Sequence, residues 1–125
     1  MFLLDSSVIL ACLDNEDGAR KALSLIEEGA IISTVNYTEV IHKLRQRRIS
    51  PTRVGSFFVK TNIEQISYTP KQASESLKLP IGRDIQLSLA DRACLATAIS
   101  LGCSVLTADR AWAELKLPIK VELIR

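Results

Sequence analysis

The chain has few of the residues that build zinc and redox sites. Its 125 residues include three cysteines and one histidine. Cys12, Cys94 and Cys103 are odd in number, lie among apolar residues and show no close paired spacing, so we interpret them as free core thiols. His42 has no Cys or His neighbour, and no nearby serine suggests a catalytic triad. Zinc binding and acyl transfer are therefore weak hypotheses.

Long apolar runs and a strong net charge are also absent. No stretch reaches the roughly 18 uncharged apolar residues that cross a bilayer. The apolar start MFLLDSSVILACL lacks a basic leader and contains Asp5, unlike a signal segment. We therefore expect a soluble cytoplasmic protein with no membrane partner. Sixteen basic and 14 acidic residues leave a formal net charge of only +2, which by itself does not indicate a polyanionic partner.

Length and composition predict a single domain over residues 1–125. A chain of this length leaves no room for a second independent core. The apolar share of 47% and the charged share of 24% are ordinary for a globular protein and give no sign of disorder. The chain also contains no linker, internal repeat or low-complexity segment.

Short apolar runs alternate with helical patterns along the whole chain. The runs predict strands over 2–5, 30–33, 63–68, 104–107 and 121–124. The intervening segments predict helices over 8–13, 19–28, 35–48, 51–60, 70–79 and 88–101, and a last short helix beginning at Asp109. Start signals are Ser6 or Ser7, Ser50-Pro51 and Ser88, and Gly29 and Gly102 end two helices. This alternation predicts an α/β fold with a mostly parallel five-stranded sheet and helices on both faces.

Four carboxylates stand where predicted helices begin, most of them just after a predicted strand. They are Asp5, Glu39, Asp91 and Asp109. The carboxyl ends of parallel strands meet at one edge of a sheet, so these side chains are expected to form an acidic pocket there. Carboxylate oxygens are the ligands that a hard cation such as Mg²⁺ requires. The sequence therefore predicts a metal site at this edge.

Three of these acids also have a purely structural interpretation. Asp5 and Asp109 are each suitable as an N-cap. Glu39 follows Asn36 by three residues, as in a capping box, and precedes Lys43 by four, which is the spacing of a helical ion pair. Taken singly, each residue is weak support for a metal site, and the hypothesis depends on their convergence.

Asp91 is harder to explain without a ligand. Its segment, SLADRACLATAISL, is apolar around nearly its whole circumference, so we expect a buried helix. A buried carboxylate is costly unless it is paired or binds a cation. Arg92, or a capping role three residues after Ser88, would also satisfy it. The remaining loop acids are interpreted as turn residues: Asp14, Glu16, Asp17 and Asp84.

Four segments of the chain resemble the motif blocks of PIN-domain nucleases. They are LLDSSVIL at the start, NYTEV after the second predicted strand, SLADRACLATA, and LTADRAW near the end. In order and spacing they span essentially the whole chain, which most resembles the VapC toxins of type II toxin–antitoxin systems. The resemblance implies a PIN-like three-layer α/β/α sandwich. It also implies that Asp5, Glu39, Asp91 and Asp109 form the family's acidic quartet, binding Mg²⁺ or Mn²⁺. Ser7 and Thr107 match positions of small hydroxyl residues that orient an acid or a water.

The function implied by this resemblance is a metal-dependent endoribonuclease. It would hydrolyse RNA phosphodiesters in line, leaving a 5′-phosphate and a 3′-hydroxyl, and would form a homodimer and bind a cognate antitoxin. An acidic pocket repels phosphate, so basic residues are needed around it. A solvated helix face is the commoner explanation of a basic run, and such residues contact the RNA backbone rather than its bases. The candidates are Lys43, Arg45, Arg47, Arg48, Arg92 and Arg110.

Three other functions compete with the nuclease hypothesis. A phosphoacceptor receiver domain expects an aspartate ending the third strand, and 63–68 contains none. A haloacid-dehalogenase-like phosphatase expects a second aspartate where this chain has Ser7. The stronger rival is a catalytically idle module on the same fold that acts with an antitoxin as a DNA-bound regulator. An intact set of four acids argues against it without proving turnover.

Overall fold

The structure, a computed structural model, describes all residues from 1 to 125. The strands are β1 (Phe2–Leu4), β2 (Ala30–Ser33), β3 (Glu64–Ile66), β4 (Ser104–Thr107) and β5 (Val121–Leu123). The helices are α1 (Ser6–Leu13), α2 (Ala19–Ile26), α3 (Thr34–Gln46), α4 (Pro51–Thr61), α5 (Pro70–Glu75) and α6 (Leu89–Leu101). Two 3-10 helices, η1 (Ser76–Lys78) and η2 (Arg110–Glu114), complete the set. The predicted α/β alternation is confirmed.

The five strands form one sheet in the order β3-β2-β1-β4-β5. Every neighbouring pair is parallel, and Leu3 of β1 is in register with Ile31 of β2 and Val105 of β4. The chain proceeds outward from β1 through β2 to β3 and then returns to the other side of β1 with β4. The sheet therefore has a topological switch point between β1 and β4, where open α/β sheets place their sites.

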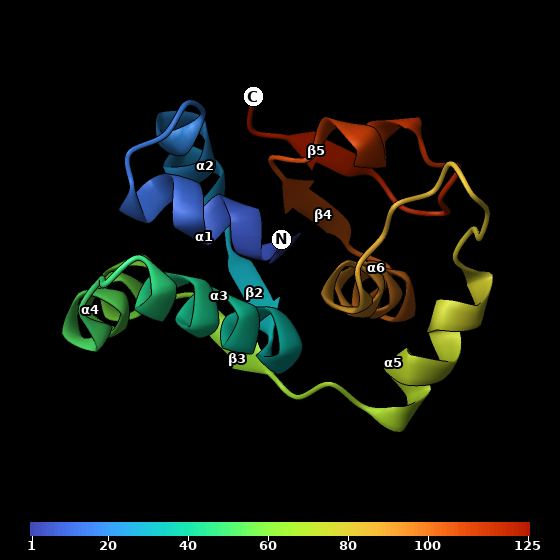
Figure 1. Cartoon of the computed structure of the whole chain (residues 1–125), viewed down its shortest axis with the longest axis horizontal. Helices are drawn as coiled ribbons and strands as arrows, with labels where there is room; N and C mark the ends of the chain where they lie inside the picture. Colours follow the sequence, from blue (N-terminus) through green and yellow to red (C-terminus); the bar gives the residue numbers. More distant parts are fainter.

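Helices cover both faces of the sheet, which gives the predicted three layers (Figure 1). Side chains alternate across the strands: Leu4, Ile32 and Leu106 lie in one core with helices α1 to α4, and Leu3, Ile31 and Val105 in a second core with α6 and Trp112. Fully burying one such leucine contributes roughly 1.5–3 kcal/mol. These two cores hold the carboxyl ends of the strands in fixed positions.

Several helix ends follow the predicted signals. The Ser50 side chain accepts a hydrogen bond from Thr52 N–H and is followed by Pro51 at the start of α4, Ser88 caps α6, and Gly102 ends α6 in the left-handed conformation. The third predicted strand is shorter than expected, because only Glu64–Ile66 pairs with β2 at the sheet edge. The helix predicted over 70–79 ends at Glu75 and continues as η1, and the helix after Asp109 is a 3-10 helix.

The predicted cap of the first helix is wrong. Asp5, rather than Ser6 or Ser7, occupies the N-cap position of α1, and its side chain makes no capping hydrogen bond. The Ser6 and Ser7 hydroxyls instead donate to the carboxylates of Glu39 and Asp5. Carboxylates are stronger acceptors than neutral groups, so they attract these hydroxyls. Capping therefore does not account for the Asp5 side chain.

Candidate functional site

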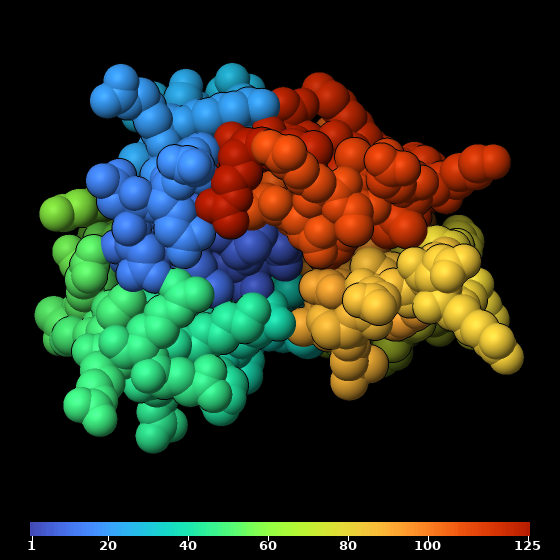
Figure 2. Space-filling model, turned by 45° about the horizontal axis from the view of Figure 1, so that its top comes forward, coloured from blue at the N-terminus to red at the C-terminus, as the bar shows by residue number.

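The four candidate acids lie at the carboxyl-end edge of the sheet. Asp5 directly follows β1, Asp109 lies two residues after β4, Glu39 is in the second turn of α3, and Asp91 is in the first turn of α6. Figure 2 shows the N-terminal segment, in dark blue, within a hollow bordered by α3, α6 and the red C-terminal residues. The acids thus come from four separate elements that meet at the switch point between β1 and β4.

Asp5 is the most constrained of the four. It is only 4% exposed, and its Oδ2 accepts hydrogen bonds from Ser7 Oγ at 2.6 Å and Thr107 Oγ1 at 2.9 Å. Its Oδ1 is buried and has no partner. The structure therefore orients one oxygen with two hydroxyls and leaves the other free to bind a ligand.

Burial raises the pKa of Asp5 from 3.8 to about 6, although the two hydroxyls partly oppose the shift. The nearby carboxylates of Asp91 and Glu39 raise this pKa further. A buried carboxylate that faces other carboxylates is an unfavourable place for negative charge unless a cation is bound. Burial therefore disfavours the ionised form of Asp5, and Oδ1 remains an acceptor without a protein partner.

Asp91 caps α6 and also lies near other negatively charged side chains. Its Oδ2 accepts from Ser88 N–H at 2.9 Å, and its own N–H donates to Ser88 Oγ at 3.1 Å, which confirms the predicted cap. Arg92 does not pair with it, because Arg92 Nη1 donates to the Pro80 carbonyl. Burial raises the pKa of Asp91, the bonds to Ser88 oppose this, and nearby negative charge raises the pKa again.

Glu39 is held by a serine that the sequence analysis did not identify. Ser6, which is 2% exposed, donates its hydroxyl to Glu39 Oε1, and Lys43 Nζ lies 3.7 Å from Glu39 Oε2. The predicted ion pair with Lys43 is thus present. A signal for Ser6 was available, since it begins α1 directly after Asp5 and so lies at the same edge.

The predicted capping box of Asn36 and Glu39 is wrong. α3 starts at Thr34, and its cap is Ser33, three residues before Asn36. The Ser33 side chain accepts from Val35 N–H at 3.3 Å. Asn36 is therefore inside the helix, where its Nδ2 donates to the Ala90 carbonyl of α6 at 3.2 Å. Glu39 consequently has no capping role.

Asp109 is exposed and caps η2, as predicted, by accepting from Ala111 N–H at 3.0 Å. Its own N–H donates to Thr107 Oγ1 at 3.0 Å, and that hydroxyl in turn donates to Asp5. Ser7 Oγ lies 3.4 Å from Thr107 Oγ1 and accepts from Ala108 N–H. Ser7 and Thr107 therefore connect β1 to the segment after β4, and this connection positions Asp5 relative to Asp109.

The donor set fits a hard divalent cation. All four candidate side chains offer oxygen only, and Asp5 Oδ1 is a buried acceptor without a partner. As the side chains stand, no group of three or more His, Cys, Asp or Glu residues encloses a metal position. After burial, Asp91 and Glu39 both raise the pKa of Asp5, and Glu39 and Asp109 raise the pKa of Asp91, so negative charges gather at this edge. Small rotations of exposed side chains are the kind of change that a bound cation induces.

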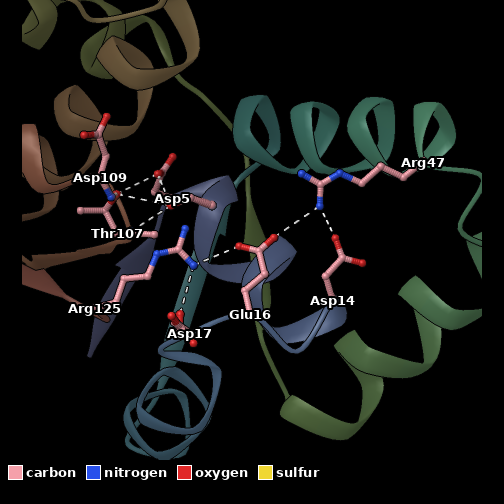
Figure 3. A network of polar contacts seen from close by, with 10 residues as sticks. Asp5, Asp14, Glu16, Asp17, Arg47, Thr107, Asp109 and Arg125 are labelled. Carbon is pink, nitrogen blue, oxygen red and sulfur yellow. Dashed lines mark hydrogen bonds and ion pairs between the residues drawn. The ribbon is translucent and has the colours of Figure 1, made fainter.

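The basic residues at this end of the molecule are only partly free. Arg47 pairs with Asp14 and with Glu16 Oε1 at 3.6 Å, so its charge is compensated (Figure 3). Arg110 Nε donates to the carbonyl of Arg125 at 3.4 Å. Of the other predicted RNA-binding residues, Arg45 and Arg48 are exposed and have no side-chain ion pair.

Arg125 is a further residue that the sequence analysis did not identify. Its Nη1 lies 3.0 Å from Glu16 Oε2 and 3.0 Å from the Asp17 carbonyl. Figure 3 shows the pairs formed by Arg47 and Arg125 as one chain of contacts through Glu16. No local pattern indicates a pair separated by 109 positions, so only the fold reveals it.

Three hollows of the molecule have linings that include none of the four acids. The hollow beside Trp112 is lined mostly by the loop around residues 84–87 and by residues 111–116. None of the helices combines the length and the apolarity that a membrane span requires.

Comparison with known families gives a match over most of the chain. The model of the PIN domain family matches residues 2–117, a range that includes all four acids. None of the curated proteins matches the chain.

Three solved structures share its fold. VapBC2 from Rickettsia felis, bound to a DNA fragment from its promoter, gives a TM-score of 0.74 at 14% identity and covers 97% of this chain and 96% of that one. DNA-bound VapBC from Salmonella typhimurium gives 0.69 at 20% identity, covering 99% and 98%. A toxin–antitoxin complex from Klebsiella pneumoniae gives 0.75 at 18% identity, covering 100% and 98%. At these identities the likeness establishes the fold.

Proposed function

The chain belongs to the PIN domain family, and from that premise we propose that it is a Mg²⁺- or Mn²⁺-dependent endoribonuclease, the toxin of a type II toxin–antitoxin system. The family is one of nucleases, so the reaction class is hydrolysis of a phosphodiester. We propose that residues 1–125 act as a single nuclease domain. RNA as substrate and the divalent metal are the parts that the proposal adds.

The observation that carries the proposal is the state of Asp5. Asp5 is a carboxylate that is 4% exposed and oriented by two hydroxyls, and its second oxygen is buried without any protein partner. Its pKa of about 6 is raised first by burial and also by Asp91 and Glu39. The ionised form is therefore unfavourable, and a bound cation would stabilise it. Perturbed carboxylates that face each other are typical of functional sites.

The roles of the acids follow from their positions. Asp5 and Asp91 would hold the cation between β1 and α6, while Glu39 and Asp109 would hold a second ion or orient the attacking water. A divalent cation bound there lowers the pKa of a coordinated water and neutralises charge that develops on the phosphodiester. Ser7 and Thr107 keep Asp5 oriented, and Ser6 does the same for Glu39. The products would be a 5′-phosphate and a 3′-hydroxyl.

Basic residues around the acidic edge would hold the RNA strand. Lys43 lies beside Glu39, and Arg92 and Arg110 each follow one of the acids in sequence. Arg45 and Arg48 extend the positive charge along the end of α3. These side chains would contact phosphates, so they contribute to affinity rather than to sequence choice. Arg47 contributes less, because Asp14 and Glu16 already compensate its charge.

The proposed partners are an antitoxin and a second copy of this chain. The solved structures similar in fold include complexes of a VapC-type toxin with its antitoxin, and that likeness supports an antitoxin for this protein. A homodimer is proposed on the same basis as the toxin assignment. Both are tested by copurification and by light scattering of the purified protein.

The deciding experiment is cleavage of total RNA by antitoxin-free protein with Mg²⁺ or Mn²⁺ and with EDTA. The test variants are Asp5→Asn and Asp91→Asn. Glu16→Gln is the matched control, because it also removes one acid but lies outside the proposed metal site. We expect discrete fragments that require metal, persist in the control and disappear in both test variants. Equal behaviour of all four proteins would refute the nuclease.

The alternative is a catalytically idle regulator that binds DNA with its antitoxin. It is supported by the fold likeness to two complexes that were solved with DNA. Under this alternative, Asp5→Asn leaves the binding of the protein–antitoxin complex to promoter DNA unchanged, and the wild type shows no metal-dependent RNA cleavage that the variant could lose. Loss of RNA cleavage with retained DNA binding supports the nuclease, since only catalysis needs the carboxylate.

A further inference from the structure

Asn36 is the most buried polar side chain near the acids that the proposed reaction does not use. It is 0% exposed and lies between α3 and α6, two helices that pack against each other. Its Nδ2 donates to the Ala90 carbonyl at 3.2 Å, and its Oδ1 is buried without a partner. A half-satisfied amide in a protein interior is costly, so its presence requires an explanation.

The location of this bond relates it to the acids. Asn36 is one helical turn before Glu39 on α3, and Ala90 directly precedes Asp91 on α6. The bond therefore joins the first turn of α3, which precedes the turn of Glu39, to the first turn of α6, which carries Asp91. The orientation of the amide is determined, because a flip would place Oδ1 against the Ala90 carbonyl oxygen.

The bond also acts against a repulsive force. Glu39 and Asp91 carry like charges on the two helices that the bond joins, and Lys43 offers Glu39 its one ion pair, at 3.7 Å. Like charges favour separation of the segments of α3 and α6 that carry them. A hydrogen bond between the two turns opposes the separation. An apolar pair at this position would fill the same space without giving a directional restraint.

We propose that Asn36 is a positioning residue of the acidic pocket, whose buried hydrogen bond to Ala90 fixes the segment of α3 that leads to Glu39 relative to the first turn of α6, which carries Asp91. The inference rests on the proposed function, because it assumes that these acids bind a cation. It assigns Asn36 no contact with substrate. Its effect is on the affinity for the cation and on the order of the two first turns.

The test measures Mn²⁺ binding to the metal-free protein by titration calorimetry, together with thermal unfolding. The variants are Asn36→Leu, which keeps the branched shape but is larger, and Asn36→Ala, which excludes overpacking as a cause. The matched control is Thr97→Val, because Thr97 is also 0% exposed and its hydroxyl bonds only within α6, to Ala93 at 2.7 Å. Asp5→Asn reports whether the acids bind the metal at all.

We expect both Asn36 variants to unfold cooperatively and to bind Mn²⁺ about tenfold more weakly or worse, a loss typical of residues that support metal ligands. Thr97→Val should stay within about twofold of the wild type, since its bond is remote from the acids. In metal-free protein, amide hydrogen exchange in residues 89–92 should accelerate in the Asn36 variants alone. A purely structural role would lower stability without this pattern.

The outcomes separate the two hypotheses. If folded Asn36 variants bind Mn²⁺ as tightly as the wild type, the inference about Asn36 is wrong and the proposed function stands. If the wild type and Asp5→Asn bind Mn²⁺ equally or not at all, the proposed function is wrong and the inference falls with it. Weaker binding in the Asn36 variants, with normal binding in Thr97→Val, supports the positioning role.

Discussion

Two acidic regions of the molecule differ in how their charges are compensated. In the loop after α1, Asp14 and Glu16 pair with Arg47, and Glu16 also pairs with Arg125. At the sheet edge, Lys43 beside Glu39 provides the one ion pair among the four acids, at 3.7 Å. The first region is a structural network, whereas the second holds negative charge that the protein does not neutralise.

The difference shows that carboxylates gathered in one region are not always compensated by basic side chains. Both regions contain several carboxylates close in space, so clustering alone does not identify a site. Burial and neighbouring carboxylates raise the pKa values of Asp5 and Asp91. Neither carboxylate has an arginine partner, whereas Arg47 and Arg125 pair with the acids of the loop. A buried charge without a protein partner is stabilised when a cation arrives from solution.

The largest expected contrast is in catalysis. Asp5→Asn and Asp91→Asn should lower the rate of metal-dependent RNA cleavage by roughly 10³-fold, because each removes a ligand of an ion that contributes several kcal/mol to the transition state. Glu16→Gln should stay within about threefold of the wild type. Single-turnover cleavage of one defined RNA substrate measures the rates of the test variants and of the control. A loss in Glu16→Gln as large as that in Asp5→Asn would remove the distinction between the regions.

The second contrast is in stability without metal. The pKa of Asp5 is about 6 in the fold against an ordinary 3.8, so the folded protein binds this proton more tightly than the unfolded chain. Asp5 therefore favours folding fully below its ordinary pKa, and that contribution is lost as pH rises to about 6. Above this window the free energy of unfolding is lower by at most about 3 kcal/mol.

Asp5→Asn cannot titrate and can still accept a hydrogen bond, so at pH 7.5 the metal-free variant should be more stable than the wild type. Urea unfolding at pH 4 and pH 7.5 with EDTA measures the difference, which should be larger at the higher pH. Glu16→Gln should instead destabilise the protein at both values. If Asp5→Asn were less stable than the wild type at pH 7.5, the unfavourable ionisation of Asp5 would be disproved.

The third contrast is in the response to metal. Mn²⁺ should raise the unfolding temperature of the wild type at pH 7.5, and the increase should shrink as pH falls through about 6, where Asp5 takes up a proton that competes with the ion. Glu16→Gln should show the same response. Asp5→Asn should show little response at any pH. Scanning calorimetry at several pH values tests this, and an increase of equal size in Asp5→Asn would place the metal elsewhere.

The smallest expected effect concerns the loop network. Arg47→Ala and Arg125→Ala should each lower the free energy of unfolding by less than about 1 kcal/mol, because partly exposed ion pairs contribute little. The loss should diminish in 1 M salt, which screens exposed charges. RNA cleavage should be nearly unchanged. A large loss of cleavage in Arg47→Ala, with stability retained, would instead assign Arg47 to RNA binding.

Local sequence signals predicted most of the fold. Ser50-Pro51, Ser88 and Gly102 determine helix ends through bonds and dihedral angles within a few residues, and these predictions are confirmed. The incorrect predictions involve side chains whose true partners are distant. Ser6 and Asn36 were assigned to caps, yet Ser6 bonds Glu39 across 33 positions and Asn36 bonds Ala90 across 54. Capping propensity describes the neighbouring backbone and cannot identify a stronger acceptor on another element.

The sequence by itself determined the alternation of strands and helices, the family blocks and the identity of the four acids, because each depends on residues close together in the chain. The tertiary structure decided which acids are neutralised. It brought Arg47 and Arg125 to Glu16, and it left Asp5 buried at the switch point between β1 and β4 with one oxygen free. Charge compensation is a property of distances in space, and a parallel sheet sets those distances only after its strands have taken their order.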